Sequence, residues 1–412
     1  MVFYNHNKTI TQKGNFMKKI ILSAVSLLLA SAMITACGGN AASNDSTTEA
    51  TAEAAVEEKV GEMRDISSME LVKDMGLGWN LGNTLDVCNA DRDGDGKADE
   101  TAENVDETLW GNPKATQELF DTLKADGITA VRIPVTWRDH LDENNNINAE
   151  WMDRVQEVVD YAYNIGMYVI INVHHDGGDD AKFGAWVRSA ADDYDTFYAR
   201  YSAIWNQIAE RFRDYSDYLV FESMNEVGFD SLPETKAYEL LNKINQDFVD
   251  LIRKSGGNNE KRHLLIAGYW TDVEKTCSDK FKMPDDPAGR CIVSVHYYTP
   301  WDFCTTNIKN EWGSAAEVKT MERLIGKMNT TFVENGIPVI IGEYAASGND
   351  MASCVFFIEK LNKLCYDYGM ATFLWDNGGQ VDRTTYQWRT PAFLEAMKRA
   401  SSGEDYEVVK GE

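Results

Sequence analysis

Two glutamates follow apolar runs of the same design. Glu226 closes the stretch YLVFESMNE (218–226), and Glu343 closes the stretch PVIIGE (338–343). Such runs are typical of parallel strands covered on both faces, which carry their last residues to one edge of a sheet. Two carboxyl groups that meet at strand ends can perform double displacement at a glycosidic bond, one as acid/base and the other as nucleophile. Taken singly, each glutamate has an equally good explanation in local hydrogen bonding.

The other expected strands also end in polar or aromatic residues. Their last positions are Asn83; Arg132; His174, His175 and Asp176; Asn225; His296 and Tyr298; and Trp375, Asp376 and Asn377. Each position alone is a weak indication, but a closed barrel brings all its strand ends into one ring. We therefore expect one site, in which Trp375 either offers a flat apolar face to a sugar ring or packs in the core.

The glutamates need different surroundings for these roles. Glu226 must hold a proton near neutral pH to protonate a leaving oxygen, so we expect its pKa to be raised. Glu343 must be ionised, and Arg132 and Tyr298 could donate to it and hold it as the anion. Asn225, next to the expected acid, could bind the sugar hydroxyl beside the reacting carbon.

Strands and helices are expected to alternate along the chain. Strand patterns lie at 76–83, 130–134, 168–173, from 218, 263–267, 291–296, 338–343 and 371–375, and helical patterns at 67–75, 113–126, 149–165, within 194–215, 233–254, 315–335, 351–368 and 391–400. Eight such units indicate an α/β protein with a (β/α)8 TIM barrel as its single catalytic domain, whose site lies at the strand C-termini. A doubly wound open sheet is the alternative, but no strand is followed by a glycine-rich phosphate loop.

Several motifs resemble glycoside hydrolase family 5, and in particular its subfamily 4 of endo-β-1,4-glucanases and xyloglucanases. They are GWNLGNTLD (78–86), WGNP (110–113), VRIPVTW (131–137), INVHHD (171–176), FESMNE (221–226), VHYYTPWDF (295–303), IGEY (341–344) and WDNG (375–378). One departure is Val227, where the family commonly has proline after its acid/base glutamate.

The resemblance implies a (β/α)8 barrel and a retaining endo-β-1,4-glucanase of cellulose-type glucans that needs no cofactor. Xyloglucan, mannan and xylan are alternative substrates. The resemblance assigns the acid/base role to Glu226 and the nucleophile role to Glu343. Supporting positions would be Arg132, His174, Asn225, His296 and Tyr298, and sugar contacts would come from Asn83, His175, Trp301 and Trp375.

The start of the chain has the features of an export signal. Residues 1–36 contain two lysines after Met17, which we expect to be the true start, and then an apolar segment that ends in small residues before Cys37. We expect Cys37 to be acylated, residues 37–62 to form an acidic tether, and 63–405 to form the catalytic domain. With an acylated Cys37 the protein would be an extracellular lipoprotein on the cell surface that touches the membrane only through Cys37. The alternative is an ordinary signal peptide with an incidental cysteine.

Composition narrows the choice of partners. The 412-residue chain has a formal net charge of −26, which disfavours nucleic acid and acidic polymers and leaves a neutral β-glucan as a suitable substrate. Six cysteines remain besides Cys37, and their irregular spacing leaves the pairing open. A monomer is expected.

The stretch DRDGDGKADE (91–100) is the one segment with calcium-ligand spacing. Asp91, Asp93 and Asp95 alternate before Gly96, as in a calcium loop, but the twelfth position is Ala102 instead of glutamate. A structural calcium ion and a solvated acidic loop are both compatible with this pattern.

Two other classes of function compete with the glycosidase. A polysaccharide-binding surface lipoprotein without catalysis would share the aromatic cleft but would not need both glutamates. A metal-dependent barrel hydrolase could use His174, His175 and His296, but it would want a His-x-His pair on the first strand, where the sequence has asparagines.

The expected anchor gives a first prediction. If Cys37 is acylated, Cys37→Ser should move the protein from the membrane fraction to the medium, because the hydrophobic anchor is lost. Fractionation followed by immunoblotting measures this, and an unchanged distribution would contradict the anchor.

Overall fold

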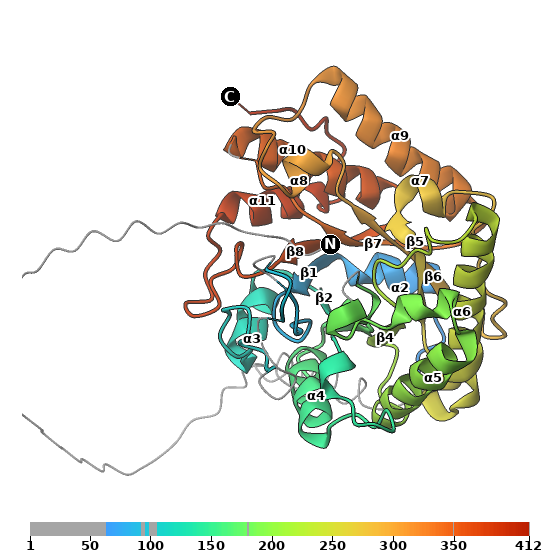
Figure 1. Cartoon of the computed structure of the whole chain (residues 1–412). Coiled ribbons are helices and arrows are strands. Elements are labelled where there is room, and N and C mark those ends of the chain that lie inside the picture. Colours follow the sequence, from blue (N-terminus) through green and yellow to red (C-terminus); the bar gives the residue numbers. More distant parts are fainter. Residues whose placement is uncertain (1–62, 92–94, 99–104, 179–180, 349, 412) are drawn as a thin grey trace, which may run out of the picture.

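Eight parallel strands close into a barrel in the order β1 to β8 (Figure 1). The computed structural model describes residues 63–91, 95–98, 105–178, 181–348 and 350–411. The strands are β1 (Leu77–Leu81), β2 (Ala130–Ile133), β3 (Tyr168–Asn172), β4 (Leu219–Glu222), β5 (Leu264–Asp272), β6 (Cys291–Tyr297), β7 (Val339–Tyr344) and β8 (Ala371–Asp376). β1 pairs in parallel with β8, which closes the ring. The (β/α)8 expectation is therefore confirmed.

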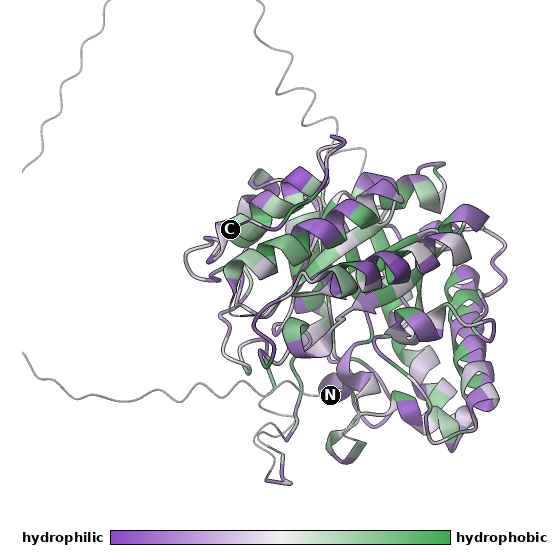
Figure 2. Ribbon diagram, turned by 90° about the horizontal axis from the view of Figure 1, so that it is seen from above, coloured by the Kyte–Doolittle hydropathy of each residue, from purple (hydrophilic) through white to green (hydrophobic). Residues whose placement is uncertain are grey.

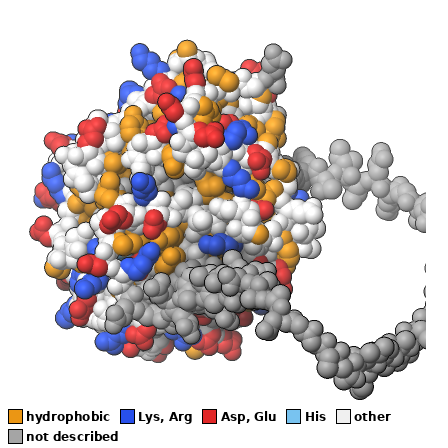
Figure 3. All heavy atoms as spheres, turned by 180° about the vertical axis from the view of Figure 1, so that it is seen from behind, with side chains coloured by type: hydrophobic (Ala, Val, Ile, Leu, Met, Phe, Trp, Pro, Cys, Tyr) orange, Lys and Arg blue, Asp and Glu red, His pale blue; other side chains and the backbone are white. Residues whose placement is uncertain are grey.

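The α-helices lie around the outside of the barrel and at its two ends. They are α2 (Ser68–Met75), α3 (Gln117–Ala125), α4 (Ala149–Tyr163), α5 (Tyr194–Arg211), α6 (Glu234–Lys254), α7 (Val273–Thr276), α8 (Trp301–Cys304), α9 (Ala315–Thr331), α10 (Met351–Asp367) and α11 (Pro391–Ala400). Their apolar stripes face the strands and their polar stripes face solvent, as Figure 2 shows by hydropathy. On the face in Figure 3, acidic and basic side chains are interspersed.

Helix α2 covers the end of the barrel where the strands begin. Ser67 caps it by accepting from the Glu70 amide, while the Glu70 carboxylate accepts from the Ser67 amide. The helix buries Leu71, Val72 and Met75 against an interior layer of Ala130, Tyr168, Ile170, Val220, Leu265, Ile292, Ile340, Ala371 and Phe373. Ahead of it, Arg64 donates to Asp217 and to the Tyr168 hydroxyl. This end is packed shut, so the opposite end is left for a site.

Several element boundaries differ from the expected ones. Helix α3 begins at Gln117 and not at residue 113, and α9 ends at Thr331, followed by a short 3-10 turn at Val333–Asn335. Strand β5 extends past residue 267 to Asp272, with an irregular register against β6 and left-handed φ angles at Trp270 and Thr271. The strand expected from the sequence ended at residue 267 because glycine, which follows at position 268, usually interrupts a strand pattern.

The described part of the chain also bears on the remaining expectations. Its six cysteines are free thiols. Among its helices, none is both long and apolar enough to cross a bilayer. Cys37 and the expected signal and tether (1–62) lie outside the described residues. After residue 405 the chain still contacts helix α10, where Tyr406 donates to Glu359 and Lys410 donates to Ser353.

The helix at the closed end gives a stability prediction. Leu71→Ala should lower the free energy of unfolding by about 3 kcal/mol, because it removes a fully buried side chain from a layer that cannot collapse around the gap. Urea unfolding measures the change. Lys73→Ala, on the exposed face of the same helix, should change it by less than about 0.5 kcal/mol. Equal effects of the two substitutions would contradict this packing.

Candidate active site

The two glutamates meet at the open end of the barrel. Glu343 lies in β7, and Glu226 follows β4 after a turn. One carboxylate oxygen of each, together with a ring nitrogen of His296, lie within 4.8 Å of one another. The side chain of Glu343 is 7% exposed and that of Glu226 is 39% exposed. The strand ends therefore bring together the two carboxyl groups that the sequence singled out.

Arg132, from β2, lies fully buried beneath the pair. Its Nη1 donates to Glu343 Oε1 at 2.7 Å, its Nη2 to Asn225 Oδ1 at 2.8 Å, and its Nε to Glu222 Oε2 at 2.7 Å. Nη1 also donates to Asn80 Oδ1 at 3.1 Å. Burial alone would lower the pKa of Arg132, but the charges of Glu222 and Glu343 raise it above its ordinary value. Arg132 is thus a fixed cation at the base of the site.

Two groups from the end of β6 contact the glutamates. The Tyr298 hydroxyl donates to Glu343 Oε2 at 2.9 Å, and burial, followed by the charge of Glu343, raises the pKa of this phenol, so it stays a donor. His296 Nδ1 lies 2.8 Å from Glu226 Oε1 and 3.6 Å from Glu343 Oε2. Glu343 is therefore held by two donors, as expected for an anion, and Glu226 by one.

The pKa directions of the two glutamates differ from the expectation. Burial raises the pKa of Glu343, and the charge of Glu226 adds to the increase while His296 and Arg132 oppose it. Burial is the largest single influence on Glu226 and would raise its pKa, but the hydrogen bond and charge of His296, together with the charge of Arg132, outweigh it and lower that pKa. The expected raised pKa of Glu226 is thus wrong for this structure, because His296 lies nearer to Glu226 than to Glu343. Two carboxyls this close disfavour each other's ionisation, which favours one proton shared between them.

Aromatic rings form one wall of the site. Trp375, in β8, is partly exposed and lies parallel to the His174 ring, with 5.9 Å between centroids and 6° between planes. Gly82 makes room for it, since a Cβ there would come within 2.7 Å of the indole. Trp375 is therefore packed against the protein in part, and its partly exposed ring leaves surface for a sugar.

His174 is held in one tautomer. Asn172 Nδ2 donates to its Nδ1 at 3.1 Å, and Asn172 Oδ1 accepts from the Val135 amide, which fixes the orientation of the Asn172 side chain. Burial lowers the pKa of His174 well below its usual value, so the ring is neutral and keeps its proton on Nε2. His174 can therefore donate to a hydroxyl.

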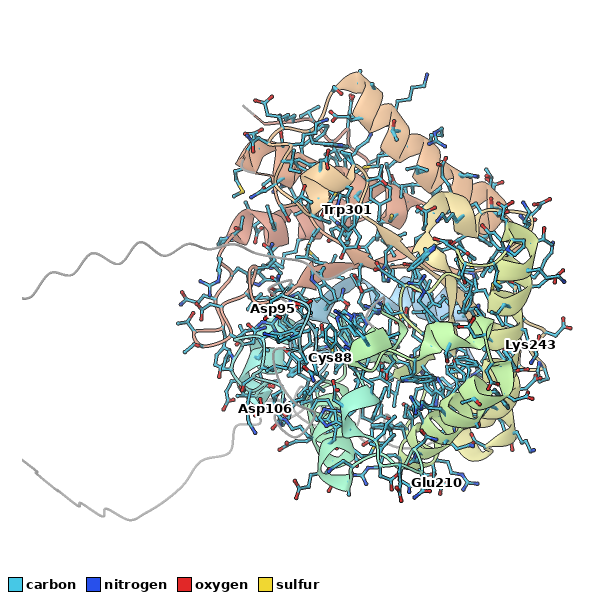
Figure 4. The ribbon with its side chains drawn as sticks, viewed as in Figure 1. Cys88, Asp95, Asp106, Glu210, Lys243 and Trp301 are labelled. Atoms are coloured by element: carbon cyan, nitrogen blue, oxygen red, sulfur yellow. The ribbon has the colours of Figure 1, made fainter. Side chains whose placement is uncertain are left out.

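The remaining expected sugar-contacting residues lie around the rim. Asn83 adopts a left-handed φ of 54°, and its carbonyl accepts from Asn112 Nδ2, which also donates to the Asn377 carbonyl. Asn112, from the WGNP motif, thus ties the loop after β1 to the loop after β8. His175 packs near Trp110, with 5.4 Å between centroids. Trp301, at the start of α8 and labelled in Figure 4, is 41% exposed. Its ring meets that of Tyr298 edge-on.

Two groups, each of three described residues, bring possible metal-ligand atoms within 4.8 Å of one another. One is Asp86 with His174 and His175, and the other is the glutamate pair with His296. In the first group the proton on His174 Nε2 leaves no lone pair for a metal there. The histidine-based metal hydrolase therefore has no complete ligand set at this position.

The acidic loop after β1 is only partly described. Asp93 lies outside the described residues, and Figure 4 labels Asp95. Asp91 Oδ2 accepts from the Gly96 amide and lies 3.8 Å from Lys182 Nζ, while Asp95 lies 3.4 Å from Lys97 Nζ. Lysines already neutralise part of this charge, so calcium binding stays a prediction.

Sequence reasoning missed the polar layer beneath the pair. It consists of Asn80, Asn172, Glu222 and Ser294, all of them fully buried. Glu222 was in view, four residues before Glu226, and a carboxylate in an apolar strand must have a buried partner. That requirement was the available signal, because Arg132 is the buried cation on β2, two strands away from β4 in the barrel.

Comparisons with known proteins agree with this geometry. A sequence profile described as cellulase (glycosyl hydrolase family 5) matches residues 94–381. Endoglucanase A of Paenibacillus barcinonensis is 35% identical over 350 residues, covering 77% of this chain and 84% of that protein.

Solved structures give the same result. A family 5 xyloglucanase from Paenibacillus pabuli, in complex with a ligand, is 32% identical with a TM-score of 0.73, covering 80% of this chain and 99% of its own. A GH5-4 broad specificity endoglucanase from an uncultured bovine rumen ciliate is 35% identical with a TM-score of 0.73. The match covers 82% of this chain and 99% of that chain.

Proposed function

The chain belongs to glycosyl hydrolase family 5, and from that membership we propose that it is a retaining endo-β-1,4-glucanase. The observation that carries the proposal is the short separation of two carboxylates, within 4.8 Å of one another. Retaining glycosidases keep their carboxyls about 5 to 5.5 Å apart, whereas inverting ones need about 6.5 to 9.5 Å to admit a water. The spacing therefore supports direct attack by a carboxylate.

Glu343 is the nucleophile in this proposal. Arg132 and Tyr298 donate to its two oxygens, and Asn225 keeps its amide nitrogen free for a sugar hydroxyl because its oxygen accepts from Arg132. Glu343 attacks the anomeric carbon while Glu226 gives its proton to the leaving oxygen, which yields a glycosyl ester on Glu343. Glu226 then removes a proton from water, and the water oxygen displaces Glu343.

Substrate binding shifts the shared proton to Glu226. The exposed carboxyl of Glu226 faces the space for the sugar, and a bound ring would exclude water from it and so raise its pKa. Trp375 offers its ring face and His174 its Nε2–H to the sugar on the side of β8 and β3. These contacts orient the bond between the two carboxyls.

A β-1,4-glucan is the proposed substrate, and xyloglucan is the second candidate. Relatives named endoglucanase support the first, and the Paenibacillus pabuli xyloglucanase supports the second. A panel of cellulose derivatives, mixed-linkage glucan, xyloglucan, glucomannan and xylan, assayed for new reducing ends, separates them. Exclusive activity on xylan or glucomannan would overturn the substrate proposal.

The mechanism gives a stereochemical prediction. Proton NMR of the first product should show the β-anomer before mutarotation, because two inversions restore the configuration. Glu343→Ala should lose turnover, and azide should restore it by forming the α-glycosyl azide. Glu226→Ala should lower the hydrolysis of cello-oligosaccharides by about 10² to 10⁴-fold but hydrolyse activated aryl glycosides well in its first step, since a good leaving group needs no proton.

A first product in the α configuration would rule out the retaining mechanism. Retained turnover in both variants would favour the sugar-binding lipoprotein instead. Loss of turnover in a chelator, restored by a divalent metal, would favour the metal-dependent hydrolase.

We also propose that Asp91, Asp93 and Asp95 bind calcium. Calcium added after a chelator should then raise the melting temperature, because a ligand of the native state stabilises it by mass action. Asp95→Asn should reduce the increase. An unchanged melting temperature at millimolar calcium would leave a solvated loop. The monomeric state, the absence of a required cofactor and the Cys37 anchor stay predictions.

A further inference from the structure

Glu222 is a buried carboxylate that the proposed reaction does not use. It is the last residue of β4 and is fully buried. Its Oε1 accepts from Ser294 Oγ at 2.7 Å, and its Oε2 accepts from Arg132 Nε at 2.7 Å and from Asn172 Nδ2 at 3.0 Å. Three donors from β2, β3 and β6 thus converge on one carboxyl. A group that accepts at both oxygens and is paired with a guanidinium is an ionised carboxylate.

Arg132 is shared between two carboxylates. It contacts Glu222 and Glu343 at the same distance of 2.7 Å, through two different nitrogens. One positive charge therefore serves the buried anion below the site and the proposed nucleophile within it. When Glu222 is ionised, Arg132 and Glu222 together are neutral.

We propose that Glu222 is a positioning residue that balances the charge of Arg132 and thereby keeps one proton on the Glu226 and Glu343 pair near neutral pH. The inference rests on the proposed function, because that proton is the one a double-displacement glycosidase delivers. Without the balancing charge, Arg132 would stabilise both members of the pair as anions. The acid would then be lost at a lower pH.

The other groups around the pair do not replace this balance. They are Asn80 from β1, His174 and His175 after β3, His296 and Tyr298 from the end of β6, and Trp375 and Asp376 from β8, while β5 brings no charged side chain into hydrogen-bond contact with the pair in the described part. The His174 ring and the Tyr298 phenol are neutral. Asp376 accepts from the amides of the turn that follows it.

Among the described residues in hydrogen-bond contact with the pair, His296 is the further group that could carry charge. Its Nδ1 lies against Glu226, and its buried Nε2 has no hydrogen-bond partner among the described residues. A proton on Nε2 would therefore be buried without an acceptor, which is unfavourable. His296 thus reaches the pair only through Nδ1, whereas Arg132 is the cation that contacts both Glu222 and Glu343. The raised pKa of Glu343, caused first by burial and then by the charge of Glu226 against the opposing charges of His296 and Arg132, agrees with a balanced cluster.

Glu222→Gln tests the proposal because glutamine keeps the shape and removes the charge. The pH profile of kcat/KM should be measured on a neutral cello-oligosaccharide, whose poor leaving group requires the acid. We expect the basic limb to move to lower pH by about one unit, because removal of a nearby negative charge favours ionisation of the pair. KM should change little, since Glu222 lies below the space for the sugar.

Ser294→Ala is the matched control. It removes one hydrogen bond to Glu222 but leaves the charge, so the basic limb should stay at the wild-type pH while the melting temperature falls slightly. A purely structural role of Glu222 would instead lower kcat and stability at every pH and leave the limb in place. That result for Glu222→Gln would overturn the proposal.

A direct titration decides the inference without turnover. In wild-type protein with 13C-labelled glutamate carboxyls, one carboxyl assigned by Glu226→Gln or Glu343→Gln should titrate above about pH 6, compared with an ordinary value of about 4.3. In Glu222→Gln this titration should move to lower pH. If both carboxyls of the wild type lose their protons near the ordinary value, the proposal is wrong. If the titration behaves as expected but no glycan is hydrolysed, the proposed function fails and the charge balance stands.

Discussion

One buried guanidinium sets the geometry of the site. A charge taken out of water must be paired and hydrogen-bonded, and Arg132 achieves this with Glu222, Glu343, Asn225 and Asn80 from β1, β4 and β7. These strands come together only when the barrel closes. Closure of the barrel and placement of the proposed nucleophile are therefore one event, and any change that leaves Arg132 unpaired weakens both.

Much of the fold and the upper part of the site could be predicted from the sequence. Apolar runs of four to six residues that end in Glu226 or Glu343 report buried parallel strands directly, because a strand covered on both faces has few other sequence patterns. Parallel strands point the same way, so their polar ends must meet. The hydrogen bonds from Arg132 and Tyr298 to Glu343 follow from that, and the structure contains both.

The parts that could not be predicted depend on pairwise geometry. Glu222 lies in a strand that reads as apolar, and only its distance to Arg132 shows that it is paired. The proton affinities of the two glutamates depend on which of them His296 approaches more closely, and the sequence does not show that this is Glu226. Strand β5 continues past the glycine at 268 and pairs with β6 again at Asp272 after an irregular stretch, which local sequence does not reveal.

The central claim is that Glu343 attacks the sugar while Arg132 holds it as the anion. A 2-deoxy-2-fluoro cello-oligosaccharide with a good leaving group slows the second step, so the covalent intermediate should accumulate. Mass spectrometry of the intact protein and of its peptides is the direct measurement. The account predicts one added glycosyl group per chain, located on Glu343. A label on Glu226, or on no residue while the substrate is consumed, would contradict it.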